Sequence, residues 1–395
     1  MNDRPSLSES GTPPRVGLVL PGGGARAAYQ AGVLQAIAEL LPPDSRNPFP
    51  IITGTSAGAI NAAMIASRAR QFQEGVKHLV GVWEHIRTDR VFRTDSMTIL
   101  KTAMAWLITL LHAGFGRYTP MSLLDNAPLR RLLEQHIVFA HLQQAIDEGV
   151  LDALAVTASG YSSARSISFY KGHAGIQPWH RMRRLGQPAE IRLDHIMGSV
   201  ALPMIFPAVR IGREYFGDGS MRQAAPLSPA VHLGADRVLV IAVRNEQANR
   251  LPERDEQIAY PSLGQIAGYM LDTLFMDSIY GDLERLQRIN ETVSHINDGS
   301  APLKIINTMV VVPSEDIRDI ADRHKREFPR SVRLLLRGVG GLHRSGSQLL
   351  SYLLFESGYC RELVALGHRD AMAQRDKLME FIGIDSDVKQ DQVAG

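Results

Sequence analysis

The N-terminal part of the chain alternates short apolar runs with helical patterns, and this alternation constrains the fold more than any other feature. The run at 15–20 (RVGLVL) ends at Pro21 and three glycines, which is typical of a buried strand entering a tight turn. Residues 25–40 follow with apolar side chains at helical spacing. A second short run at 50–54 and an Ala-rich helical pattern at 57–70 repeat the unit. Strands alternating with helices predict a mostly parallel sheet covered by helices on both faces, a three-layer α/β/α fold.

The rest of the chain continues this pattern. Helical patterns dominate 71–148, and a long one covers 262–297. Further strands are predicted at 151–158, 166–170, 208–211, 214–216, 237–243 and 304–312, with a short helix at 194–201. Several helices rich in arginine and leucine are expected beyond Pro313. Because the segment at 304–312 is expected to return to the sheet, the C-terminal third is not expected to fold independently.

Composition narrows the class of protein. The chain of 395 residues is 45% hydrophobic and 21% charged, which excludes disorder as an overall description. A net charge of +2 does not predict a nucleic-acid-binding surface. The single cysteine, Cys360, cannot form an internal disulfide, which fits a reducing compartment. Residues 1–14 are polar and lack the apolar core of a secretory signal, so we expect a flexible lead-in and a cytoplasmic protein.

The segment most similar to a membrane span is 97–115 (MTILKTAMAWLITLLHAGF). Its apolar core, 103–111, is about half the ~20 residues that a spanning helix needs. Two interpretations stay open: a buried core helix, or an amphipathic element over a lipid-binding cleft. The second would allow peripheral contact with the inner membrane surface.

The sharpest chemical signal is Gly54-Thr55-Ser56-Ala57-Gly58, which lies between a predicted strand and a predicted helix. A nucleophile at such a turn needs small neighbours, because the backbone is strained and the hydroxyl must project from it. The helix N-terminus beneath the serine would favour developing negative charge. The alternative is a small-residue turn in which Ser56 only caps the helix.

A second signal is Pro21-Gly22-Gly23-Gly24-Ala25-Arg26, where consecutive backbone N–H groups could form an anion cradle. Its spacing also satisfies a relaxed dinucleotide fingerprint, which expects an acidic residue at the end of the second strand. That strand ends in Gly-Thr-Ser, so the dinucleotide interpretation is disfavoured. A simple tight turn stays possible. The third signal, Gly217-Asp218-Gly219-Ser220, is common in turns and gains meaning only beside the other two.

Together and in this order, the three motifs resemble those of the patatin-like phospholipase family, which carries a Gly-rich loop, a G-x-S-x-G turn and a later Asp-Gly-Gly or Asp-Gly-Ala motif. The resemblance extends to 25–34 (ARAAYQAGVL), 199–207 (SVALPMIFP) and 226–240 (PLSPAVHLGADRVLV), and so covers about 15–243. The C-terminal helices, including 349–355 (LLSYLLF), look similar to those of bacterial members.

The resemblance implies a catalytic domain at 15–245 with a mainly helical region, 246–395, packed on it. It makes Ser56 the nucleophile and Asp218 its partner in a Ser–Asp dyad, without a cofactor. The N–H groups of Gly22, Gly23 and Gly24 would form an oxyanion hole, with Arg26 fixing that loop or attracting lipid phosphate. Gly54 and Gly58 would flank the nucleophile, and Gly219 would belong to the acid loop.

The implied activity is hydrolysis of fatty acyl esters, as by a phospholipase A or a lysophospholipase. Two positions depart from the family pattern: Ala27 replaces a usual glycine, and Ser220 replaces glycine or alanine. Both substitutes are small, so the geometry is expected to survive.

Two other functions are considered for a chain with these motifs, an acyltransferase and a lipid-binding scaffold. A serine acyltransferase would need a catalytic histidine and a carboxylate-binding arginine, and neither can be placed. A lipid-binding scaffold of the same fold without turnover stays open. No metal-ligand motif appears. The basic cluster Arg181-Met182-Arg183-Arg184 could attract anionic lipid, although charge runs are usually solvated faces.

Overall fold

The computed structural model of the chain describes residues 14–43, 45–94, 122–244, 260–296, 303–338, 340–341 and 346–384. Residues 1–13 of the N-terminal lead-in predicted at 1–14, and the apolar segment at 97–115, lie outside the described residues. None of the helices in the described ranges combines the length and the apolar character that a membrane span requires.

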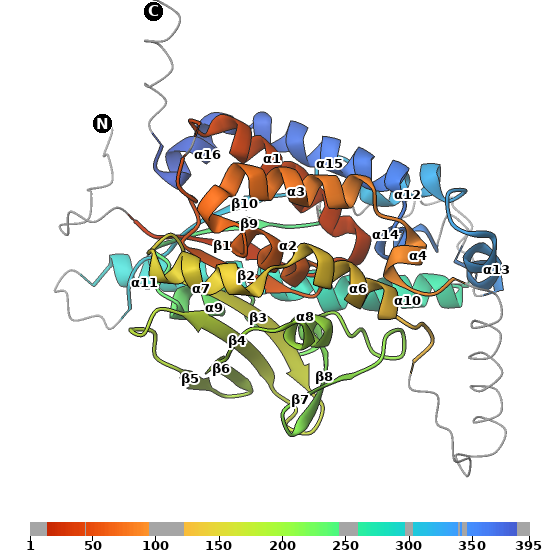
Figure 1. Cartoon of the computed structure of the whole chain (residues 1–395), viewed down its shortest axis with the longest axis horizontal. Helices are drawn as coiled ribbons and strands as arrows, with labels where there is room; N and C mark the ends of the chain where they lie inside the picture. The colour runs from red at the N-terminus through yellow and green to blue at the C-terminus, as the bar shows by residue number, and fades with distance from the viewer. Residues whose placement is uncertain are drawn as a thin grey trace, which may run out of the picture.

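Ten strands of the described chain form one mixed sheet with the order β10-β9-β1-β2-β3-β4-β6-β5, and β8 joins β3 and β7 (Figure 1). The strands are β1 (Val16–Leu20), β2 (Ile51–Thr55), β3 (Ala153–Gly160), β4 (Ser166–Gly172), β5 (Trp179–Arg181), β6 (Arg184–Pro188), β7 (Val209–Ile211), β8 (Glu214–Asp218), β9 (Arg237–Ile241) and β10 (Asn307–Val311). From β10 to β3 the strands run parallel, whereas β4 and β8 pair with β3 antiparallel. This confirms the predicted α/β fold with a mostly parallel central sheet.

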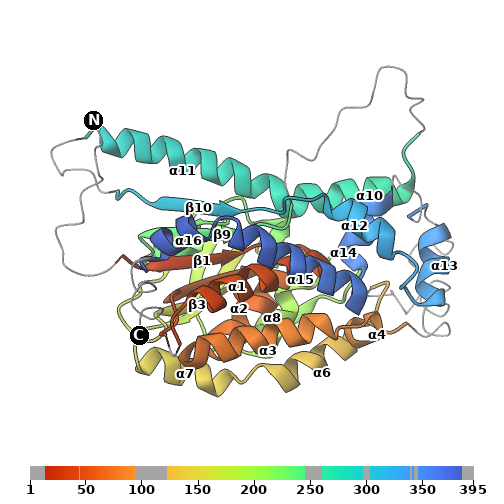
Figure 2. The same ribbon diagram turned by 90° about the horizontal axis from the view of Figure 1, so that it is seen from above.

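Helices lie on both sides of this sheet. They are α1 (Ala28–Leu40), α2 (Ala57–Ala66), α3 (Phe72–Glu84), α4 (Thr88–Val91), α6 (Ala127–His136), α7 (Phe139–Asp147), α8 (Leu193–Ser199), α9 (Ser228–His232), α10 (Leu263–Asp272), α11 (Ser278–Ser294), α12 (Ile317–His324), α13 (Arg330–Gly338), α14 (Ser347–Leu353), α15 (Ser357–Met372) and α16 (Arg375–Ile382). Figures 1 and 2 show α1, α3 and α15 together over one face, and Figure 1 shows α9 on the other side of β1 and β2.

The C-terminal residues are joined to the sheet in two ways. Strand β10 pairs in parallel with β9, as the sequence pattern at 304–312 predicts. Helix α15 packs closely on α1. A Cβ at Gly32 would lie only 1.9 Å from the Val364 carbonyl oxygen, and one at Gly367 would lie 2.2 Å from the Tyr29 carbonyl oxygen. Two glycines thus let the helix backbones approach each other.

Two features differ from the sequence prediction. The β5–β6 hairpin was not predicted, because its short strands expose polar residues and only Trp179 anchors it, stacked between Tyr170 and His232. Its turn contains Arg183 at a φ of 61°, so the predicted basic cluster is the solvated tip of a hairpin. The long helix predicted at 262–297 is interrupted by a π-helical turn at Thr273–Asp277 between α10 and α11.

Candidate active site

Ser56 lies at the sharp turn between β2 and α2. Its φ of 53° and ψ of −130° belong to a region that non-glycine residues rarely occupy. The turn is held by Ser199, whose Oγ accepts a hydrogen bond of 2.9 Å from the Ser56 N–H and donates one of 2.6 Å to the Thr157 carbonyl. The backbone of Ser56 is therefore fixed by a neighbouring helix end and by β3.

The glycines around Ser56 are required by close backbone contacts. A Cβ at Gly54 would lie 2.5 Å from the carbonyl oxygen of Gly58, and a Cβ at Gly58 would lie 2.0 Å from that of Leu20. These contacts bring the N-terminus of α2 against the end of β1, beside the Gly-rich loop. The N-terminal end of α2 favours negative charge at the turn.

Asp218 ends β8 and is almost completely buried, with 1% of its surface exposed. Its Oδ1 accepts a hydrogen bond of 2.9 Å from the Ser220 N–H, whereas Oδ2 has no hydrogen-bond partner among the described residues. Burial raises the pKa of Asp218 to about 6, and the nearby Ser56 hydroxyl and the Ser220 bonds lower it by smaller amounts. The hydroxyl of Ser56 is thus close to the carboxyl group without meeting the geometry of a hydrogen bond.

The loop after Asp218 packs against the strand that carries Ser56. A Cβ at Gly219 would lie 2.1 Å from the Thr157 carbonyl oxygen and 2.7 Å from Cγ2 of Thr55, so only glycine allows this approach. Gln223 also joins the two segments, since its Oε1 accepts a hydrogen bond of 2.6 Å from the Thr55 hydroxyl.

Ser56 and Asp218 line one narrow pocket. The two side chains lie 162 positions apart in the sequence (218 − 56), and the fold brings them together. The rest of the lining is almost entirely apolar and comes from the glycine loop and the helices around α2: Gly24, Ala57, Ile60, Met64, Val82, Trp83, Ile86, Val91, Leu129, Leu132, Leu133, Val200, Leu202, Phe206, Phe275, Tyr352, Leu353 and Phe355.

The Gly-rich loop lies between β1 and α1 at the pocket. A Cβ at Gly22 would meet the ring of Phe275 at 2.6 Å and the hydroxyl of Ser220 at 2.8 Å. Gly24 has a φ of +55°, which disfavours residues with a side chain, and a Cβ there would lie 2.3 Å from the Tyr352 carbonyl oxygen. Among the described residues, no hydrogen bond engages the N–H groups of Gly22, Gly23 or Gly24. Of the three glycines, Gly24 lines the pocket.

A buried amide network holds the carbonyls at both ends of this loop. Gln30 donates to the Pro21 and Ile241 carbonyls, and Asn61 donates to the Ala27 carbonyl and to the Gln30 side chain. Trp83 completes it with an N–H donated to Asn61 at 2.8 Å. Because every group has a partner, the network rigidifies the loop and ties it to a pocket wall.

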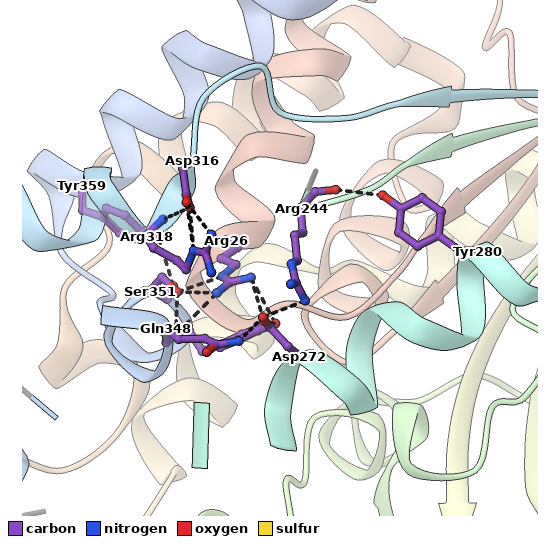
Figure 3. Close-up of polar contacts among 10 residues, drawn as sticks. Arg26, Arg244, Asp272, Tyr280, Asp316, Arg318, Gln348, Ser351 and Tyr359 are labelled. Atoms are coloured by element: carbon purple, nitrogen blue, oxygen red, sulfur yellow. Dashed lines mark hydrogen bonds and ion pairs between the residues drawn. The ribbon is translucent and has the colours of Figure 1, made fainter. Parts of the chain in front are cut away.

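The Arg26 side chain does not line the pocket and lies in a buried polar cluster (Figure 3). It donates to Ser351 at 2.6 Å and to Asp272 at 3.1 Å, and its guanidinium lies 3.8 Å from the ring centre of Tyr352. Arg244 binds the same Asp272 carboxylate at 2.7 Å. Of the two roles expected for Arg26, these contacts fit the fixing of the loop, whereas attraction of lipid phosphate is not supported.

Several of these residues carried no signal in the sequence. Gln30 and Ser199 fall within segments of the family resemblance, but Asn61, Asp272 and Phe275 belong to ordinary helical patterns. Within the described residues, no group of three or more His, Cys, Asp or Glu side chains is arranged to hold a metal ion.

The fold and the site define an α/β protein with a strained serine, a buried aspartate and a Gly-rich loop at one apolar pocket. The family model described as patatin-like phospholipase matches residues 18–231. The chain belongs to this family.

The chain is also similar to individual known proteins. It is 26% identical over 211 residues to a protein of Pseudomonas aeruginosa (strain BWHPSA011 / Pa011) named cGAMP-activated phospholipase, and the match covers 53% of each chain. The chain thus matches about half the length of that curated relative. Among solved structures, VipD from Legionella pneumophila covers 94% of this chain and 69% of its own at 12% identity, with a TM-score of 0.35. The match to human GIVD cytosolic phospholipase A2 covers 94% of this chain and 59% of the human one, at 13% identity and with a TM-score of 0.45. At these TM-scores neither structure supports an argument about this chain.

Proposed function

We propose that the protein is a lipid acyl hydrolase that cleaves fatty acyl esters through an acyl-serine intermediate, with Ser56 as nucleophile and Asp218 as general base. The observation that carries the proposal is that both side chains line one apolar pocket, together with Gly24 of the Gly-rich loop. Family membership and the phospholipase named among the relatives support the reaction class. Activation by cGAMP is not carried over, because the match covers about half of that relative.

In the proposed reaction, Asp218 takes the proton of the Ser56 hydroxyl as Oγ attacks the ester carbonyl carbon. The carbonyl oxygen becomes an oxyanion, which the N–H groups of Gly22 to Gly24 stabilise by about 3–4 kcal/mol per donor. When the intermediate collapses, the alcohol or lysolipid leaves with the proton from Asp218. Water then attacks the acyl-serine, Asp218 accepts its proton, and the fatty acid departs as Ser56 regains its hydrogen.

The environment of Asp218 suits this role. A carboxylate with an ordinary pKa near ~3.9 is a weak base at neutral pH. Burial raises the pKa of Asp218 to about 6, which brings it closer to the working pH and strengthens it as a base. The apolar lining of the pocket suits an acyl chain, because it offers few polar groups that a hydrocarbon would leave unsatisfied.

The direct test is labelling by a fluorophosphonate probe, followed by peptide mapping and a panel of phospholipid, lysophospholipid and neutral lipid esters. We expect the probe on Ser56 and release of free fatty acid from at least one lipid. Transfer of the acyl group to an alcohol acceptor in preference to water would identify an acyltransferase. An unlabelled protein that still binds lipid would identify a scaffold, and labelling of another residue would contradict the assignment.

The buried cluster around Arg26 gives a further prediction. Replacing Arg26 by methionine leaves Asp272 with one cationic partner fewer and releases the Gly-rich loop from α14. We expect a stability loss of about 3 kcal/mol, measured by urea unfolding, together with lower ester hydrolysis per folded molecule. Arg70→Met is the matched control, because Arg70 forms an exposed ion pair with Glu148 that should contribute about 0–1 kcal/mol. Equal losses for the two variants would contradict a special role for Arg26.

A further inference from the structure

Helix α10 carries a row of large apolar side chains that the fold leaves in solvent. The exposed residues on this helix and just before it are Tyr260, Leu263 (70% exposed), Ile266, Tyr269 (68% exposed) and Met270. Residues 263–270 (LGQIAGYM) contain no charged side chain. An uncharged, exposed apolar stripe of this kind usually marks a binding surface.

The opposite side of α10 is fixed against the body of the protein. A Cβ at Gly264 would lie 2.7 Å from Cα of Gly341, and one at Gly268 would lie 2.8 Å from the N atom of Leu349. At its C-terminal end, Asp272 is held by Arg26 and Arg244. The helix therefore cannot rotate to bury its apolar stripe without breaking this packing.

Helix α13 lies at the same end of the molecule, as Figures 1 and 2 show. The two helices are joined through Gly341, which contacts Gly264 and donates its N–H to the Leu336 carbonyl of α13 at 2.8 Å. Val332 and Leu336 are buried, whereas Leu334 (72% exposed) and Leu335 face solvent.

The charges on α13 are all of one sign. The helix carries Arg330, Arg333 and Arg337 and no acidic residue. Within the described part of the chain, none of these three side chains forms an ion pair. A basic helix with exposed leucines is the pattern that binds the interface of an anionic bilayer, because the leucines enter the acyl region while the arginines contact headgroups.

This surface is connected to the candidate active site. Phe275 follows α10 in the π-helical turn, lines the pocket with Ser56 and lies against Gly22. A partner bound to the exposed face of α10 would therefore lie next to the pocket that would receive an acyl chain.

We propose that the exposed faces of α10 and α13 form a docking surface for a lipid bilayer with anionic headgroups. The occupant follows from the three arginines of α13, which have no acidic partner among the residues that the structure describes, and from the link through Phe275 to an apolar pocket. The biological role of this surface rests on the proposed lipid hydrolase activity, but binding to vesicles can be measured without turnover. The surface differs from the hairpin tip at Arg181–Arg184, which presents arginines without an adjoining apolar stripe.

The test is flotation of the Ser56→Ala protein with vesicles of phosphatidylcholine, with or without phosphatidylglycerol. We expect co-flotation with the anionic vesicles that weakens at high salt. A triple variant of α10 (Leu263→Ser, Ile266→Ser, Met270→Ser) should reduce the bound fraction by about tenfold. A triple variant of α13 (Arg330→Gln, Arg333→Gln, Arg337→Gln) should remove the dependence on phosphatidylglycerol. These are exposed or half-buried positions, so folding should be unaffected, which thermal unfolding would verify.

The matched control removes the same number of charges at the hairpin tip: Arg181→Gln, Arg183→Gln and Arg184→Gln. It should bind like the parent protein. Absence of co-flotation, or equal losses in the control, would overturn the proposal. So would a dimer that the α10 variant dissociates while vesicle binding stays unchanged, because the stripe would then be a contact between copies. Hydrolysis of a soluble short-chain ester by the wild-type protein tests the proposed function separately from docking.

Discussion

The Ser56→Ala variant is expected to lose ester hydrolysis by at least about 10⁴-fold while keeping its fold, since no other group would form the acyl intermediate. The structure predicts little loss of stability. The Ser56 hydroxyl makes no hydrogen bond with the described residues, and its N–H bond to Ser199 survives in alanine. The measurement is initial rates on a short-chain ester and on vesicle lipid, beside urea unfolding of both proteins.

A second substitution at this position serves as a control for backbone strain. Ser56→Gly also removes the nucleophile, but glycine adopts a φ of 53° without a steric penalty. It should be inactive and at least as stable as Ser56→Ala. Hydrolysis by either variant at the wild-type rate would show that another residue is the nucleophile.

The Asp218→Asn variant is expected to lose activity by about 10²–10⁴-fold, the usual contribution of a general base. The amide has nearly the same shape, and its oxygen can accept the Ser220 N–H as Oδ1 does now, so the loop geometry should be kept. In the wild-type protein, kcat/KM should rise with pH and level off above about pH 6, where Asp218 becomes ionised. The residual activity of the variant should lack this rise.

The same substitution should change how stability depends on pH. Because the pKa of Asp218 is raised from 3.8 to about 6 by folding, ionisation opposes the folded state. Its contribution to stability is therefore lost as pH rises from about 4 to 6, by roughly 3 kcal/mol in total. The unfolding free energy of Asp218→Asn minus that of the wild type should therefore be larger at pH 8 than at pH 4, as measured by urea unfolding. A stability difference that does not change with pH would show that the carboxyl group is not perturbed by burial.

The elements of the sheet could be predicted because each buried strand is a short apolar run with its own turn signals. Strands β1, β2, β3 and β9 are buried along almost their whole length, so the local pattern and the tertiary structure agree. The β5–β6 hairpin could not be predicted in this way, because one tryptophan and not a repeating pattern anchors it. The π-helical turn at 273–277 likewise has no local signal: its Phe275 lies against Gly22, and Asp272 just before it pairs with Arg26.

The sequence by itself determined most of the buried strands and the positions of Ser56, Asp218 and the glycine loop in the chain, because small residues beside strand ends are a local requirement of sharp turns. Only the tertiary structure decided that Ser56 and Asp218 share a pocket, that burial raises the pKa of Asp218, and that Arg26 points to Asp272. These properties depend on distances between residues far apart in the chain and on the exclusion of water around them, and neither is encoded in any one segment.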